Sequence, residues 1–108
     1  MIGLEELYGA LDCTGYPVAN IAFEGKVSVP FIVIMPEGSE NFMADNKVYK
    51  KFEDVEIELY TDKRDLEAES SVEKILDEFS IPYQSTAFFI AEEHLLKTTY
   101  SITIKGDK

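Results

Sequence analysis

The feature that most constrains the fold is a strand pattern that runs directly into an amphipathic helix pattern, between residues 48 and 79. In the strand half, apolar residues alternate with polar ones, which is the period of two expected for a half-buried strand. The apolar positions are Val55, Ile57 and Leu59, and the polar ones are Glu56, Glu58 and Tyr60. Phe52 is out of phase with this face, so we expect a bulge or bend near Glu53 and Asp54.

In the helix half, apolar residues recur at helical spacing and form one stripe on a charged cylinder. The stripe consists of Ala68, Val72, Ile75, Leu76 and Phe79. Asp65 is the predicted N-cap, acidic residues follow in the first turn where they suit the helix dipole, and Pro82 ends the helix. We expect the stripe to bury itself against the apolar face of the preceding strand.

The remaining segments predict one more helix and four more strands. Leu4, Leu7, Tyr8 and Leu11 have helical spacing, and Gly15 and Pro17 stop that helix. Strands are predicted at residues 18–23, 31–35, 86–90 and 96–104; the second is apolar throughout, which favours a central strand covered on both faces. Residues 92–94 form the predicted hairpin turn before the last strand. The order α-β-β-β-α-β-β predicts an α+β fold, with a largely antiparallel or mixed sheet of about five strands flanked by two helices on one face.

Length and charge restrict the function classes. The 108 residues predict a single domain over 1–108. The chain has 21 acidic and 10 basic residues, a net charge of −11, which argues against binding nucleic acid or an anionic membrane through a basic patch. The acids serve solubility, meet a basic partner or repel DNA. Cys13 is the only cysteine, so no internal disulfide is expected and a reducing compartment is favoured. No apolar run is long enough to span a bilayer and no signal peptide pattern is present, so no membrane association is expected.

Residues capable of catalysis do not form a recognisable constellation. His94 is the only histidine and lies in a predicted turn beside two glutamates, where an exposed structural role is expected. Cys13 lacks a basic neighbour or a second cysteine, which favours a small buried or half-exposed apolar role. Glu56 and Glu58 share a strand face about 7 Å apart, and we interpret them as a solvated or partner-facing acidic surface. We therefore predict no catalytic, cofactor-binding or metal site, and no enzyme activity.

Residues 36–47 are predicted to form one long irregular loop that carries the candidate interface. Phe42 and Met43 are large apolar residues in an otherwise polar stretch, and Asp45 and Asn46 are typical of turns. The apolar pair either folds back beneath the loop or forms a contact site, since exposed aromatic and methionine side chains are typical interface anchors. The candidate interface residues are Asn41, Phe42, Met43, Asp45 and Asn46.

Several stretches together resemble the small tail-completion proteins of long-tailed bacteriophages, also called tail terminators or tail-to-head joining proteins. The resemblance spans nearly the whole chain. Its marks are a loop motif and an order of elements rather than catalytic residues. The matching stretches are the N-terminal helix leading into Thr14-Gly15-Tyr16-Pro17-Val18-Ala19, then Pro30-Phe31-Ile32-Val33, the loop from Ser39 to Tyr49, Ile57-Glu58-Leu59-Tyr60-Thr61 with Lys63 and Asp65, the amphipathic helix and the closing hairpin.

The resemblance implies a virion protein that assembles into a homo-oligomeric ring, commonly a hexamer. Such a ring ends the tail tube, contacts the tail tube protein and presents a surface to the head connector protein, while DNA passes without specific binding. It implies no cofactor and no catalysis. A head-side connector or stopper subunit is an alternative in the same class, and an acidic DNA-mimicking inhibitor is an alternative from another class.

Overall fold

The computed structural model describes the backbone of residues 2–44 and 47–105, and the side chains of all of these except 37–44 and 47–51. Seven elements follow the predicted order α-β-β-β-α-β-β. They are α1 (Leu4–Asp12), β1 (Val18–Asn20), β2 (Phe31–Ala44), β3 (Lys47–Thr61), α2 (Leu66–Glu78), β4 (Gln84–Ile90) and β5 (Leu95–Lys105).

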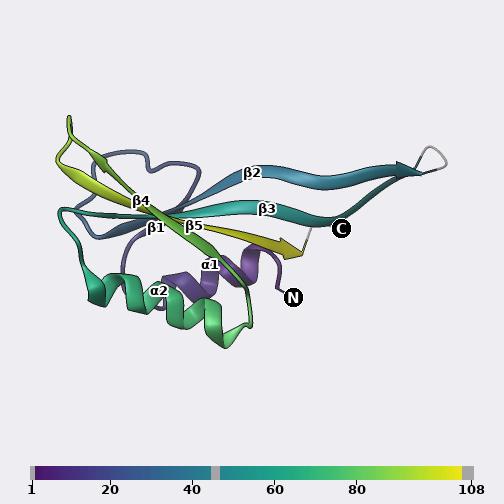
Figure 1. The fold of residues 1–108 in the computed structure, drawn as a ribbon, viewed down its shortest axis with the longest axis horizontal. Coiled ribbons are helices and arrows are strands. Elements are labelled where there is room, and N and C mark those ends of the chain that lie inside the picture. Colours follow the sequence, from purple (N-terminus) through teal and green to yellow (C-terminus); the bar gives the residue numbers. More distant parts are fainter. Residues whose placement is uncertain (1, 45–46, 106–108) are drawn as a thin grey trace.

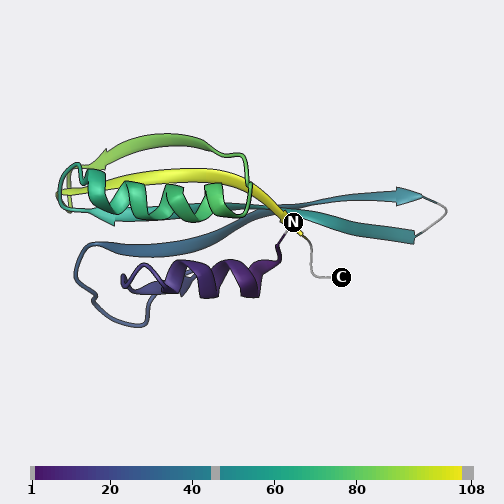
Figure 2. The ribbon, with the colours of Figure 1, turned by 90° about the horizontal axis from the view of Figure 1, so that it is seen from below.

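The strands form one mixed sheet in the order β1-β2-β3-β5-β4. β1 pairs with β2 in parallel, and the other three pairings are antiparallel. Both helices cover the same face of the sheet, as the two perpendicular views show (Figures 1 and 2). The predicted α+β fold, with its sheet and two flanking helices, is confirmed.

The core lies between the helices and the sheet, where the two periodic patterns meet. Val55, Ile57 and Leu59 of β3 are buried, and each lies opposite a residue of the alternating face of β5. The helices contribute Leu7 and Leu11 from α1, and Ala68, Val72 and Leu76 from α2. The facing residues of β5 are Thr98, Tyr100 and Ile102, all buried. Burial of these stripes, at about 1.5–3 kcal/mol for a large apolar side chain, is what holds the helical layer to the sheet.

The ends of α2 explain one success and one error of the sequence prediction. A carboxylate oxygen of Asp65 accepts a hydrogen bond from the Ala68 N–H at 3.0 Å, so the predicted N-cap is confirmed. The prediction that Phe79 belongs to the core is wrong, because the helix ends at Glu78 and the Phe79 side chain is 39% exposed. Ser80 adopts a left-handed conformation with φ 56°, and the chain reverses so that Ile81 enters the core instead.

Residues 36–44 are not the predicted irregular loop, because β2 continues through them to Ala44. Their strand is held by antiparallel pairing with β3, which supplies backbone hydrogen bonds without requiring an alternating side-chain pattern. The expected bulge at Glu53 and Asp54 is not found on β3; the register between β2 and β3 shifts instead at Glu37 on β2 and at Lys51 on β3. Between Phe52 and Val55 the pairing of β3 with β5 is continuous, so the phase difference simply places Phe52, which is 42% exposed, on the opposite face of the sheet from Val55.

The first strand is also shorter than predicted. β1 ends at Asn20, and Ile21, which was expected to continue it, has a positive φ of 77° and is 55% exposed. The predicted coverage of the second strand on both faces holds for its centre. Ile32 and Ile34 face the helices, and Val33, on the other face, is 6% exposed.

Candidate assembly surfaces

The longest projection of the molecule is a two-stranded arm, defined here as residues 37–44 of β2 and 47–51 of β3. β5 pairs with β3 only from Phe52 onward, and β1 pairs with β2 only at residues 32–34, so no third strand among the described residues pairs with the arm. It extends well beyond the helical layer (Figures 1 and 2). The arm is therefore a backbone ladder with two free edges, which is a suitable shape for reaching another subunit.

The predicted interface residues divide between this arm and the undescribed part of the chain. Asn41, Phe42 and Met43 lie on the last residues of β2 and pair with Lys50, Tyr49 and Val48 of β3. Asp45 and Asn46 lie outside the described residues. The structure thus places three of the five predicted residues near the far end of the arm, in a strand rather than in a loop, and their role as an interface stays a prediction.

The face of the sheet opposite the helices carries a hydrogen-bonded cluster that the sequence did not indicate. The Tyr60 hydroxyl donates to a Glu58 carboxylate oxygen at 2.8 Å, and the Lys97 ammonium lies 3.9 Å from the other oxygen. Glu58 is only 7% exposed, so its predicted role in a solvated acidic surface is wrong. Burial raises the pKa of the Tyr60 phenol, and the hydrogen bond to Glu58 raises that pKa further, so Tyr60 remains a neutral donor.

An apolar groove of about 670 Å³ lies over this cluster. Phe31 stacks on Tyr60 with ring centroids 4.8 Å apart, and Phe23 contacts Phe31 edge-on at 5.5 Å. Val33 and Met35 continue the groove along β2. The Glu58 carboxylate is thus engaged by the Tyr60 hydroxyl on its own strand and by the Lys97 ammonium across on β5.

The strand β4 is the least protected part of the sheet. It forms one edge of the sheet, and six of its seven residues are exposed. Phe88 is 64% exposed and Phe89 is 52% exposed. Natural proteins usually protect an edge strand with a lysine, a proline or a bulge, and β4 contains none of these. A long, uncharged and unblocked edge favours pairing with a further strand.

A second groove, of about 590 Å³, runs beside β4 on the helix face. Ala87 and Phe89 of β4 and Leu96 of β5 form its apolar wall, and Arg64 stands on its rim. Thr98 also lines it, and the buried hydroxyl of Thr98 has no hydrogen-bond partner among the described residues. An unpaired buried hydroxyl is unfavourable unless something supplies its partner, so this groove is incomplete in the single chain.

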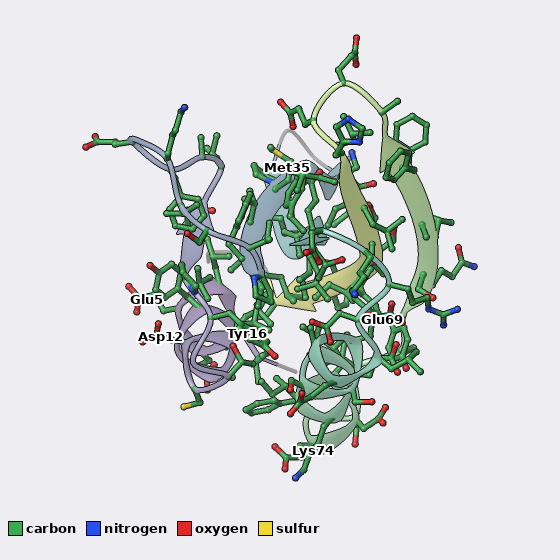
Figure 3. All side chains as sticks on the ribbon, turned by 90° about the vertical axis from the view of Figure 1, so that its left-hand side faces the viewer. Glu5, Asp12, Tyr16, Met35, Glu69 and Lys74 are labelled. Atoms are coloured by element: carbon green, nitrogen blue, oxygen red, sulfur yellow. The ribbon has the colours of Figure 1, made fainter. Side chains whose placement is uncertain are left out.

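Negative charge is concentrated on the helical layer. The two helices carry eight acidic residues against one lysine, which is −7 of the net −11. Figure 3 shows Glu5 and Asp12 on α1 and Glu69 on α2, with Met35 on the opposite side of the sheet. In contrast, residues 80–91, which include β4, contain no charged residue. Residues 37–51, which include the arm, contain three acids and three lysines.

The other residues considered for chemistry stay apart. His94 lies in the turn between β4 and β5, where a hairpin turn was expected, and its ring is 6.4 Å from that of Phe89. Cys13 caps the end of α1 and is exposed, so the predicted buried or half-exposed role is wrong. In the described part of the chain, no three His, Cys, Asp or Glu side chains are grouped to hold a metal ion, and no helix is long and apolar enough to cross a membrane.

Comparison with known proteins gives a fold and not a family. No family model matches the chain, and no curated protein matches it. One comparison with solved structures does give a match. This chain is similar to a chain from a structure described as "Virion of native gene transfer agent (GTA) particle", with a TM-score of 0.64 and 9% sequence identity. The match covers 92% of this chain and 84% of that chain. The chain therefore shares its fold, over almost its whole length, with a component of a virion.

Proposed function

We propose that this chain is a structural virion protein that forms a ring at the end of a phage-type tail tube and joins the tube to the head connector. The observation that carries the proposal is the shared fold, over 92% of this chain, with a chain from a gene transfer agent virion. The position within the particle comes from the resemblance of the sequence to tail-completion proteins, stated above. The proposed location is the head-proximal end of the tail.

The arm supports an assembly role. Within the described residues, 41–44 pair with 47–50 and with no third strand, beyond the helical layer. In a monomeric protein, a two-stranded ladder exposed to solvent is unfavourable, because its unpaired edges can pair with other chains. In a ring the arm contacts the neighbouring subunit or the tube, and this contact is repeated around the ring.

The acidic helical layer supports passage of DNA without specific binding. Six copies carry 6 × −11 = −66 formal charges, and most of the net charge of each copy lies on its helices. Like charges repel the phosphate backbone, so a lumen bordered by this layer keeps DNA from adhering. The proposal involves no catalysis and no cofactor.

Light scattering over a range of concentrations tests ring formation. The expected mass for a hexamer of the 12.2 kDa chain is 6 × 12.2, or about 73 kDa. The double substitution Phe42→Ser with Met43→Ser should leave the circular dichroism spectrum and melting temperature nearly unchanged while it impairs ring formation. A large drop in melting temperature with assembly retained at low temperature would show that the two residues stabilise the subunit and not the interface.

The head-side connector is the competing assignment within the same class. Both roles predict a ring, so mass alone does not separate them. Tails assembled without this chain do separate them: overlong tubes indicate a terminator, and tubes of normal length that fail to join heads indicate a connector.

A further inference from the structure

We propose that copies of this chain join head to tail, with the arm of one copy added as an extra strand to the exposed β4 edge of the next. The contact is β-strand addition between two different parts of the surface, and its occupant is a second copy of this chain. This inference rests on the ring assembly of the proposed function and names the surfaces that form it.

The two edges of the sheet differ in how they are protected. The β1 edge is closed: β1 has three residues, the Tyr8 hydroxyl donates to the Val18 carbonyl at 2.9 Å, and the Ala22 N–H bonds back to the Asn20 carbonyl at 2.9 Å. The β4 edge has seven residues, carries Phe88 and Phe89 exposed, and has no lysine, proline or bulge. Strand addition is therefore directed to β4 and blocked at β1.

The arm fits β4 in length. Eight residues of β2 from 37 to 44 span about 26 Å at about 3.3 Å per residue, and the seven residues of β4 span about 23 Å. Among the described residues, no strand pairs with the outer edge of β2 from Met35 to Ala44, so its backbone groups, apart from the N–H that Pro36 lacks, are available to the neighbour. Each of the two strands has one unpaired edge, and pairing them with each other gives both edges a backbone partner.

The distribution of charge favours contact through the same two surfaces, the arm and the β4 edge. Copies with a net charge of −11 repel one another, and contact is least costly where the charge is lowest. Residues 80–91 are uncharged and residues 37–51 are balanced, whereas the helices carry −7. The arm and the β4 edge are thus the surfaces on which two copies meet without opposing acids.

The groove beside β4 gives an independent indication of a missing neighbour. The unpartnered hydroxyl of Thr98 lies opposite Ala87, and Ala87 is small enough to leave the groove open toward the edge. A strand added to β4 places every second side chain over this groove. Such a side chain reaches across Ala87, supplies a partner for Thr98 and covers Phe89.

The direction of the contact also fits a ring. An open oligomer joined by arm-to-β4 contacts always has one unused arm at one end and one unused β4 at the other, so the contact repeats until the ring closes. Pairing of β4 with β4 instead gives a two-fold dimer that stops at two copies. These two arrangements are separated by cross-linking.

The first experiment substitutes a charge on the groove side of β4. Ala87→Lys leaves the monomer intact, because Ala87 is exposed and a lysine reaches solvent, but an added strand would bury the charge. We expect the concentration for half-assembly, measured by light scattering, to rise by about tenfold or more. Ser70→Lys, on an exposed position of α2, adds the same charge away from the edge and should not change assembly.

The second experiment locates the contact directly. In a Cys13→Ser background, Asn41→Cys marks the arm and Thr86→Cys marks β4; within one copy these positions are roughly 26 Å apart along the strands and three strand spacings apart across the sheet. A short thiol cross-linker should convert the doubly substituted protein into a ladder of covalent oligomers. Neither single variant should form covalent dimers.

The outcomes separate this inference from the proposed function. Covalent dimers of the Thr86→Cys variant alone, or rings that form normally with Ala87→Lys and give no ladder, overturn the arm-to-β4 contact and leave the ring assignment standing. A wild-type chain that remains monomeric at every concentration overturns both. A ladder together with weakened assembly of Ala87→Lys supports the inference, whichever end of the particle the ring occupies.

Discussion

Tyr100 joins the sheet to α2 through a part-buried hydrogen bond, and removal of its hydroxyl tests how much this bond adds to the packing of the two layers. The Tyr100 ring is fully buried, and its hydroxyl donates to a carboxylate oxygen of Glu73 at 3.0 Å. Tyr100→Phe keeps the ring and removes only this donor. Hydrogen bonds to charged groups contribute about 1.5–3 kcal/mol. Glu73 is partly exposed, so water replaces part of the lost bond and we expect a loss near about 1.5 kcal/mol.

A loss of that size is measurable in both thermal and urea denaturation. For a domain of about 100 residues it lowers the melting temperature by roughly 6–12 °C. Tyr16→Phe is the control, because the Tyr16 ring packs against the core while its hydroxyl forms no hydrogen bond with any described residue. A change below about 0.5 kcal/mol in Tyr100→Phe, within the scatter of surface substitutions, would refute the view that this bond adds to the apolar packing between the layers.

The same residue predicts a pH dependence with a definite sign. Burial raises the pKa of Tyr100, and the hydrogen bond to Glu73 and the nearby carboxylates raise that pKa further. The folded-state pKa therefore lies above the unfolded value of about 10, and the stabilising contribution is fully present below pH 10. It is lost as the pH rises above that value. The stability difference between wild type and Tyr100→Phe should shrink above pH 10 and stay constant between pH 7 and 9.

Two further predictions concern the core and the surface charge. Leu76→Ala should lower the free energy of unfolding, measured by urea denaturation, by about 2–5 kcal/mol, because Leu76 is fully buried. Phe79→Ala should lower it clearly less, because Phe79 is 39% exposed. Equal losses would show that Phe79 belongs to the core after all. Sodium chloride up to about 0.3 M should raise the melting temperature, because it screens the eight acids of the helices, which face one lysine on the same elements; an unchanged or lower melting temperature would mean that these acids are already compensated.

Short-range sequence patterns predicted correctly the strand face and the helix start that depend on neighbouring residues alone. Val55, Ile57 and Leu59 revealed their strand and its buried face, and Asp65 marked the start of α2. Phe79 was assigned wrongly to the core because one left-handed residue, Ser80, reverses the chain so that Ile81 enters the core instead, and serine gives no signal for that conformation. The error of the predicted loop has a related cause, since residues 36–44 are held as a strand by pairing with β3 and not by their own periodicity.

The candidate assembly surfaces depend on strand order, which no local pattern contains. The apolar run at residues 86–90 is visible in the sequence, but only the order β1-β2-β3-β5-β4 makes it an exposed edge and not a central strand. Likewise, Glu58 has the spacing of a solvated face, and its burial follows from contacts with Tyr60 and Lys97 in the assembled sheet. One signal was available and was not used: residues 80–91 contain no charge in a chain of net charge −11.

The measurement that tests the central claim most directly is the length of tails assembled with and without this chain. The structural genes of the particle are expressed together, with this gene present or deleted, and tube lengths are measured by electron microscopy. The account predicts uniform tails when the chain is present and overlong tubes, with no defined end, when it is absent. Restoring the gene should restore the uniform length. Tubes of the same uniform length in both preparations would contradict the claim that this protein ends the tail tube.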